Sequence, residues 1–300
     1  MKKLLIICGA TATGKTRLAI DCAKKLNTEI ISADSQLIYK NLNIGTAKPT
    51  TEEMDGVVHH MIDVVEPQCN FSVSDYCRLA EPIIGQLFRE NKVPVICGGT
   101  GFYINSLIYE LSYGSAAADD EIRNKYNALL KEKGKEFLFN LLLSVDPKTA
   151  SVLHVNDVKR VIRALEIYEV SGKRKSEIVD NLIPKYEYVA IAIDYPRDRL
   201  YERIERRVDE MFDSGLVEEV KQLVDKGLTY KNQCMQAIGY KEVLECLKNG
   251  YNESTMRNII KQNTRHYAKR QITFFKKLEG IVLLKPEEAT PEKVLELYNG

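Results

Sequence analysis

The chain opens with an apolar run, a glycine-rich loop and a helical pattern, and the loop reads GATATGKT over residues 9–16. Residues 4–8 have the length and apolar character of a buried strand. A strand, a loop of this kind and a helix in that order direct several backbone N–H groups at one anion. Lys15 adds a positive charge, and the Thr16 hydroxyl is placed to bind magnesium. The pattern therefore predicts a site for a phosphate or diphosphate. The residues expected to hold that group are Gly9, Ala10, Thr11, Ala12, Thr13, Gly14, Lys15 and Thr16.

Apolar runs of strand length alternate with helical patterns before residue 112 and again after residue 184. Such alternation predicts an α/β fold, with a parallel sheet covered by helices on both faces, as in P-loop nucleotidases. The predicted strands are 28–34, 59–65, 93–97, 186–194 and an edge strand at 281–284. The predicted helices of this part are 72–91, 197–213, 216–226, 235–248 and 254–277.

Between these two parts the pattern is helical only. A linker at 112–120 is followed by three expected helices, at 119–133, 135–144 and 156–171, the last with Asn156 as its N-cap and Gly172 as its stop. We therefore expect a core made of residues 1–112 and 184–300, interrupted by a helical insertion at 113–183.

Composition restricts the class of protein. The 300 residues are 44% hydrophobic and 28% charged, and the longest apolar runs are too short to cross a membrane. The seven cysteines form no C-x-x-C pair, which is typical of reduced thiols. We expect a cytoplasmic monomer with no membrane partner.

Asp34 ends the second predicted strand, so it should lie beside the phosphate loop at the carboxyl edge of the sheet. A carboxylate there can hold magnesium through water or accept a proton from a nucleophile, and a turn-capping role is the alternative. Gly98, Gly99 and Gly101 surround Thr100 at the end of another strand and should face the same crevice.

Basic residues recur on three predicted helices. Arg203 and Arg207 share a face and could hold a leaving diphosphate or pair with neighbouring acids. From 254 to 278 there are seven basic residues and no acid, and Arg257, Lys261, Arg265 and Lys269 recur every four residues. Lys159, Arg160 and Arg163 form a second set in the insertion. Both sets favour a polyanion partner, because a solvated face normally mixes charges.

These segments together resemble the tRNA dimethylallyltransferases over nearly the whole chain. The matching stretches are GATATGKT, ISADSQLIYKNLNIGTAKP, HHMID, FSVSDY, GGTGFYI, NDVKRVIRALEIYEVSGK, RIERRVDEMFDSGLVEEV, QAIGYKE and TRHYAKRQITFF. The resemblance implies transfer of a dimethylallyl group from dimethylallyl diphosphate to the exocyclic amine of the adenine just 3′ of a tRNA anticodon.

The resemblance also implies roles for individual residues. Asp34 would act as the base, with Thr100 helping to position the amine, and magnesium would bind at Thr16. Arg203 or Arg207 would join the loop in holding the diphosphate. The adenine has to leave the stack of the anticodon stem-loop to react. The implied tRNA contacts are Asp34, Ser35, Gln36, Leu37, Thr100, Arg123, Asp157, Val158, Lys159, Arg160, Val161, Arg163, Lys261, Arg265 and Lys269.

Three alternatives remain at this point. The first is an isopentenyltransferase for free adenine nucleotides, which would need neither basic surface. The second is a P-loop nucleotide kinase whose insertion is a lid. The third is an RNA-binding P-loop protein without catalysis, which the intact Gly14, Lys15, Thr16 and Asp34 disfavour.

Overall fold

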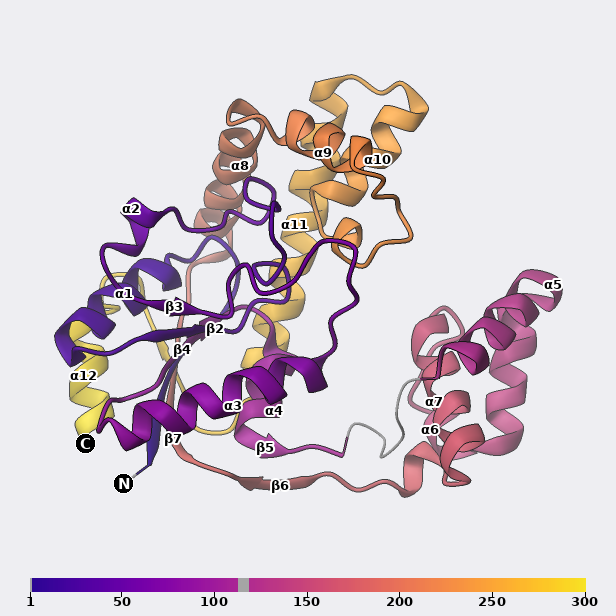
Figure 1. Ribbon diagram of the computed structural model, residues 1–300, viewed down its shortest axis with the longest axis horizontal. Helices are drawn as coiled ribbons and strands as arrows, with labels where there is room; N and C mark the ends of the chain where they lie inside the picture. Colours follow the sequence, from indigo (N-terminus) through magenta and orange to yellow (C-terminus); the bar gives the residue numbers. More distant parts are fainter. Residues whose placement is uncertain (1, 113–118) are drawn as a thin grey trace. The chain divides into compact units, whose positions relative to one another are not determined.

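The computed structural model describes residues 2–112 and 119–300, which form two compact units. Met1–Ile108 and Lys185–Gly300 make up the first unit, and Tyr109–Pro184 make up the second. The first unit contains a six-stranded parallel sheet, as the sequence predicted, and the structure gives its strand order as β3-β2-β4-β1-β7-β8 (Figure 1). The strands are β1 (Lys3–Cys8), β2 (Ile30–Ser32), β3 (His59–His60), β4 (Val95–Gly98), β7 (Glu187–Ile193) and β8 (Ile281–Leu284).

The register of the central strands places the phosphate loop. Cys8 at the end of β1 pairs with Gly98 at the end of β4, and Ser32 at the end of β2 pairs with Cys97. All three strands therefore finish at nearly the same level. The loops that follow them emerge side by side at the carboxyl edge, where ligands of parallel sheets bind.

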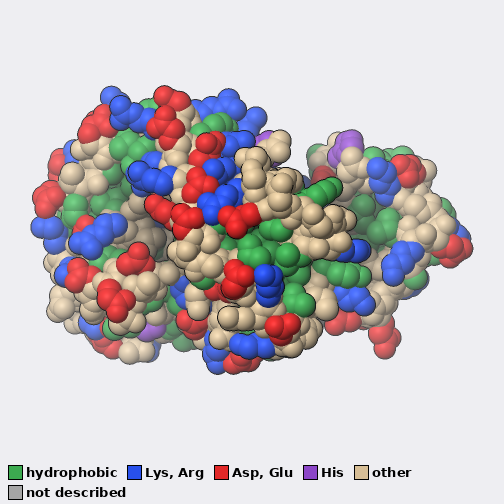
Figure 2. Space-filling view, turned by 90° about the horizontal axis from the view of Figure 1, so that it is seen from above, with side chains coloured by type: hydrophobic (Ala, Val, Ile, Leu, Met, Phe, Trp, Pro, Cys, Tyr) green, Lys and Arg blue, Asp and Glu red, His purple; other side chains and the backbone are tan. Residues whose placement is uncertain are grey.

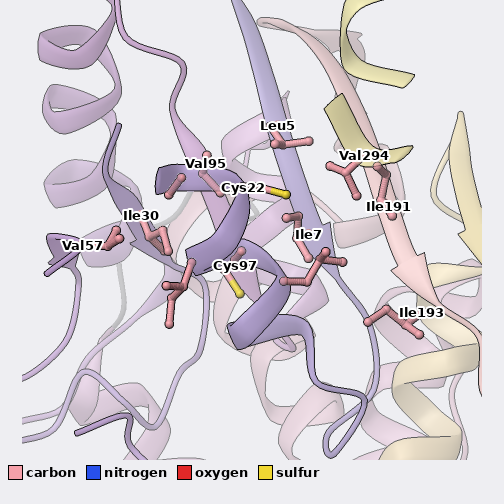
Figure 3. Packing of buried hydrophobic residues seen from close by; sticks show 14 of the residues in the cluster. Leu5, Ile7, Cys22, Ile30, Val57, Val95, Cys97, Ile191, Ile193 and Val294 are labelled. Carbon is pink, nitrogen blue, oxygen red and sulfur yellow. The ribbon is translucent and has the colours of Figure 1, made fainter. Parts of the chain in front are cut away.

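Helices cover both faces of this sheet, because each strand is apolar on both sides. Figure 3 shows one face, where side chains such as Ile7, Ile30 and Ile191 point toward Cys22 and Val294. Those last two residues belong to α1 (Lys15–Leu26) and α12 (Pro291–Asn299). The other face is covered by α3 (Val73–Arg89) and α4 (Gly101–Ile108) (Figure 1).

The remaining helices of the first unit gather beyond the carboxyl ends of the strands (Figure 1). They are α8 (Arg197–Asp213), α9 (Leu216–Asp225), η2 (Cys234–Gln236), α10 (Tyr240–Asn249) and α11 (Glu253–Phe275), and a short α2 (Thr51–Met54) precedes β3. The main helix contact here is between α8 and α11. In the described part of the chain, no helix combines the length and apolarity that a bilayer crossing requires.

Two elements of the first unit differ from the prediction. The expected strand at 59–65 ends after His60, because Met61 and Asp63 adopt left-handed backbone angles, with φ of 63° and 55°. The helix expected at 235–248 begins only at Tyr240, because Gly239 before it has a φ of 98°.

The second unit is mostly helical and has its own core. Its helices are α5 (Asp120–Val145), α6 (Pro147–Ala150), α7 (Val158–Ser171) and the short η1 (Lys175–Glu177). Leu138 and Leu142 of α5 pack with Val161 and Leu165 of α7. Gly134 breaks α5 with a φ of 81°, at the position where the sequence predicted a boundary between two helices.

This unit also contains a strand pair that the sequence did not indicate. β5 (Tyr109–Glu110) and β6 (Asn181–Pro184) pair antiparallel, and each is too short to show a period-2 pattern. Asp157, not Asn156, is the N-cap of α7, and Gly172 ends the helix as expected. Most of the linker predicted at 112–120 lies outside the described residues.

Candidate active site

The phosphate loop, residues 9–16, is shaped by its own backbone. Gly9, Ala12 and Gly14 have positive φ angles, and Gly14 forms the left-handed cap from which α1 starts. The carbonyl oxygen of Ala10 accepts hydrogen bonds from Thr13 Oγ1 at 2.9 Å and from Lys15 Nζ at 3.2 Å. The Ala10 carbonyl group and the buried Thr13 hydroxyl thus stabilise the loop from within, while Lys15 and Thr16 line the cavity at its open side.

Two cavities meet at this loop. One, of about 360 Å³, is lined by Thr11, Lys15, Thr16, Asp34, Ser35, Gln36, Leu37 and Arg207, among others. The other, of about 370 Å³, is lined by Ala12, Gly14, Lys15, Thr16, Arg203 and Arg207, among others. Lys15, Thr16 and Arg207 border both. The structure therefore brings the anion loop and Asp34 into one cavity, and it places both arginines against the loop.

Asp34 lies in a turn that is fixed by its neighbours. Its Oδ1 accepts a hydrogen bond from the Gln36 amide at 2.9 Å, and the Ser35 amide donates to Thr100 Oγ1 at 2.9 Å. The turn also depends on a close approach of two strands. A Cβ added to Gly98 would lie 2.1 Å from the carbonyl oxygen of Ala33, so only glycine fits there.

The two arginines of α8 hold different parts of the site. Arg203 Nε donates to the carbonyl oxygen of Ala12 at 2.6 Å, and its guanidinium lies over the ring of Tyr195. Arg207 Nη2 donates to the carbonyl oxygen of Thr46 at 3.3 Å. Within the described residues, Arg207 Nε is buried and has no hydrogen-bond partner. An acceptor in the cavity would satisfy it.

Burial changes the proton affinity of the cations. It lowers the pKa of both Lys15 and Arg207, and the negative charge of Asp34 acts in the opposite direction on each. The two cations also repel one another, which lowers the pKa of Lys15 further. A bound anion would favour the charged forms of Lys15 and Arg207, because it would offset both their burial and their mutual repulsion. This is the electrostatic property expected of a diphosphate site.

The segment 43–49 contributes to the lining of both cavities and is held by a residue that sequence reasoning missed. The carboxylate of Glu219, 9% exposed, accepts hydrogen bonds from the amides of Asn43, Ile44 and Gly45 and from the Tyr240 hydroxyl. An acid in a helix such as EEVKQ looks solvated, so only the tertiary contact identifies it. Glu219 therefore fixes the wall that Ala47 and Pro49 present to both cavities.

The sequence predicted a basic stripe along α11, but three of its four basic side chains are paired with acids in the structure. Arg257 pairs with Asp209, Asp213 and Glu253, Lys261 pairs with Asp209, and Arg265 pairs with Glu205. All of these acids except Glu253 lie on α8, which packs against α11. The prediction of a cationic face without acids is wrong there, because a neighbouring helix supplies the acids. Figure 2 shows acidic and basic side chains next to one another across the face that it draws.

Lys269, the fourth residue of that stripe, is exposed. It borders a surface depression of about 340 Å³ together with Arg270, Thr273, Phe274 and Lys277. This depression combines three cations with an aromatic ring. That composition suits a nucleic-acid backbone and a stacked base.

A different face of α11 lines the first cavity, at Ile260, Thr264, Tyr267 and Gln271. Tyr267 lies close to Thr100 and Gln271, and burial raises the pKa of its phenol. Gln271 contacts both the phosphate loop and Gly99. Neither residue was predicted as part of the site, although both lie in the TRHYAKRQITFF stretch.

The predicted residues of the second unit fall into two groups. Lys159 and Arg160 are exposed on α7. Arg123 and Arg163 both pair with the buried carboxylate of Glu166, at 2.9 and 2.8 Å.

Val161, also predicted to contact tRNA, is only 1% exposed, because α7 turns its side chain into the core of this unit, so only its backbone is left for such a contact. Val158 packs against the same core, and the Asp157 carboxylate accepts a hydrogen bond from the His154 amide.

The residues at the loop fit magnesium carried by a phosphate ligand. Among the described residues, no group of three or more acids, histidines and cysteines is placed to hold a metal ion. Thr16 and Asp34 nevertheless supply oxygens to one cavity. Magnesium commonly takes one or two protein oxygens and completes its shell with phosphate oxygens and water.

Comparisons with known proteins show which family the chain belongs to. A family model described as IPP transferase matches residues 37–278, and a model described as isopentenyl transferase matches residues 2–68. Among curated proteins, the chain is 44% identical over 299 residues to the tRNA dimethylallyltransferase of Acetivibrio thermocellus, covering 98% of this chain and 96% of that protein. It is 46% identical over 280 residues to the tRNA dimethylallyltransferase of Thermoanaerobacter sp. strain X514, covering 91% and 89%.

Solved structures show the same likeness in three dimensions. The tRNA isopentenylpyrophosphate transferase of Bacillus halodurans aligns with a TM-score of 0.74 at 39% identity, covering 100% of this chain and 95% of that one. A eukaryotic dimethylallyltransferase acting on tRNA aligns with a TM-score of 0.80 at 30% identity, covering 97% of this chain and 74% of that one.

Proposed function

Because the chain belongs to the IPP transferase family, we propose that it transfers a dimethylallyl group from dimethylallyl diphosphate to the exocyclic amine of an adenine in tRNA. The observation that supports this most directly is the single cavity shared by the anion loop and Asp34. A kinase needs a similar loop. The two-sided arrangement, with cations at one side and a carboxylate at the other, suits a reaction in which a diphosphate leaves and an amine loses a proton.

The loop and the arginines would bind the leaving group. As the carbon–oxygen bond of the donor breaks, negative charge accumulates on the diphosphate. Lys15, the loop amides and Arg207 are placed to stabilise it, with Arg203 beside the loop at Ala12. Gly9, Ala12 and Gly14 would contribute through backbone groups, whereas Ala10 and Thr13 keep the loop in shape and the Thr11 amide is held by Gln271.

The acceptor side would be formed by Asp34 and its turn. The amine nitrogen attacks the allylic carbon while the carbon–oxygen bond breaks, and the amine proton passes to the Asp34 carboxylate. Ser35, Gln36 and Leu37 line the cavity where the base would lie. Thr100 orients this turn through the Ser35 amide. The adenine has to be extruded from the stack to enter this cavity.

Magnesium would bind with the diphosphate at Thr16, where it would neutralise part of the charge that develops on the leaving group. The residues named above would hold the donor, exclude water and accept the proton.

The tRNA would be held by exposed cations on each unit. Lys159 and Arg160 of α7 are exposed, and Lys269 borders the depression beside Phe274. Arg123 and Arg163 would be oriented toward phosphates by Glu166. We assign Lys261 and Arg265 mainly to the packing of α11 on α8. The target would be the adenine directly 3′ of the anticodon, in a loop whose bases can be splayed out.

One experiment tests this proposal. The protein is incubated with labelled dimethylallyl diphosphate, magnesium and either unmodified tRNA or AMP. We expect the label in tRNA, and we expect none in a tRNA whose adenine 3′ of the anticodon is replaced by guanine. Label in AMP instead of tRNA would contradict the proposal, and so would phosphoryl transfer from ATP without label transfer.

A further inference from the structure

Gln271 of α11 joins two loops that the sheet itself does not connect. Its Oε1 accepts a hydrogen bond from the Thr11 amide at 2.9 Å, and its Nε2 donates to the Gly99 carbonyl oxygen at 2.9 Å. The residue is 6% exposed. Because an unpaired buried amide is costly, both of its polar atoms have to be satisfied, and both are satisfied by backbone groups of the site.

The position of this bridge follows from the register of the strands. The ladder between β1 and β4 ends at the pair Cys8 and Gly98, and the two loops diverge beyond it. The side-chain amide of Gln271 has the same donor and acceptor as a peptide group. It therefore links the two chains by hydrogen bonds beyond the last strand pair, with Thr11 of the phosphate loop on one side and Gly99 on the other.

Two further contacts connect this bridge to the reacting groups. Tyr267, one helical turn before Gln271, has its hydroxyl close to both Gln271 and Thr100. Thr100 Oγ1 in turn accepts a hydrogen bond from the amide of Ser35, the residue next to Asp34. Gly99 is also fitted to the bridge, because a Cβ there would lie 2.3 Å from Gln271 Nε2.

We propose that Gln271 is a positioning residue that sets the spacing between the phosphate loop and the turn carrying Asp34. The inference rests on the proposed function for its catalytic consequence, but its effect on the phosphate loop can be measured with pyrophosphate alone. Thr11 lines the cavity, and its amide direction depends on the acceptor that Gln271 supplies. Loss of that acceptor should loosen the anion loop. Loss of the bond to Gly99 should loosen the Thr100 turn.

The test compares Gln271→Met with Gln233→Met. Gln233 makes the same pair of hydrogen bonds, to the amide and carbonyl groups of Phe71, and it lies outside both cavities. We expect Gln271→Met to weaken binding of inorganic pyrophosphate by about tenfold, the value of about one hydrogen bond. We also expect it to lower kcat at saturating tRNA. Gln233→Met should lose thermal stability without either change.

Gly99→Ala is a second variant in case Gln271→Met does not fold. It keeps the glutamine but displaces its Nε2, so it should shift pyrophosphate affinity and kcat in the same direction. Unchanged pyrophosphate affinity and kcat in a folded Gln271→Met protein would overturn the inference, and so would equal losses in Gln233→Met. A wild-type protein that binds pyrophosphate but transfers no label to tRNA would overturn the proposed function alone.

Discussion

At the scale of single residues, the contacts of a side chain decide its role more than its type does. Asp34 and Glu219 are both acids near the same cavity. The Glu219 carboxylate is occupied by three backbone amides and a hydroxyl, so it acts as a structural clamp. Asp34 lines the cavity, and its Oδ1 accepts a hydrogen bond from the Gln36 amide, which fixes its direction. We therefore propose Asp34, and not Glu219, as the group that exchanges a proton with the substrate.

Asp34→Asn tests that assignment. The amide keeps the shape and the turn but cannot accept the proton, so we expect the transfer rate to fall by at least about 100-fold. Affinity for pyrophosphate and for tRNA should stay within about twofold of wild type. Single-turnover transfer and equilibrium binding measure the two effects separately. A variant that transfers at the normal rate would show that another group is the base.

At the scale of elements, a helix is described correctly only together with the helix that packs on it. The basic stripe of α11 is real in sequence, yet α8 supplies Asp209, Asp213 and Glu205 to it. Salt bridges of this partly exposed kind stabilise by about 1 kcal/mol or less each, so they orient α11 more than they stabilise the fold. The helix then presents Tyr267 and Gln271, not its cations, to the cavity.

The junction of α5 and α6 offers a prediction about pH. Burial by itself would raise the pKa of Asp146, but hydrogen bonds from Thr149 and Ser176 outweigh it and lower the pKa to about 2. The unfolded value is 3.8, so the folded state prefers the charged carboxylate. The stabilisation is complete above about pH 5 and is lost as pH falls through 3.8 toward 2.

We therefore expect Asp146→Asn to reduce the free energy of unfolding by about 2 kcal/mol at pH 7, from a pKa difference of about 2 units. The difference between variant and wild type should close between pH 5 and pH 2. Urea unfolding followed by circular dichroism at several pH values measures it. A difference that does not change with pH would mean that the carboxylate's charge is not what stabilises this junction.

At the scale of the whole molecule, the chain carries nearly equal numbers of basic and acidic residues, with a net charge of +1. Its attraction for a polyanion must therefore come from where the cations lie and not from how many there are. Ion pairs occupy Arg257, Lys261 and Arg265, while Lys159 and Arg160 are exposed. We therefore expect the salt-dependent contacts to come from the exposed cations of α7 and from Lys269 on α11.

The double variant Lys159→Glu, Arg160→Glu should weaken tRNA binding and reduce the slope of log K against log salt by about 1 to 2, because each phosphate contact contributes about 0.7 to 0.9. Lys131→Glu, Lys133→Glu makes the same change of net charge on α5 of the same unit and is the control. Pyrophosphate binding should be unchanged in both. Equal losses of tRNA affinity in the two variants would indicate general attraction and no specific contact.

The local signals in the sequence were enough for several parts of this protein. Residues 9–16 determine the phosphate loop, because glycine geometry, a lysine and a following helix act within eight consecutive positions. Apolar runs determined the parallel sheet, and the capping box of Ser72 and Asp75 determined the start of α3. Asp34 was identified because strands of a parallel sheet end at a common edge.

Tertiary structure alone decided what depends on distant partners. Gln271 is separated from Thr11 by 260 positions and Glu219 from Ile44 by 175, so no local pattern could pair them. The acids that neutralise α11 come from another helix, and Val161 turned inward because α5 packs on that side of α7. A sequence pattern reports the period and polarity of one segment. Which other segment packs against that segment, and which charges it brings, is determined only by the tertiary fold.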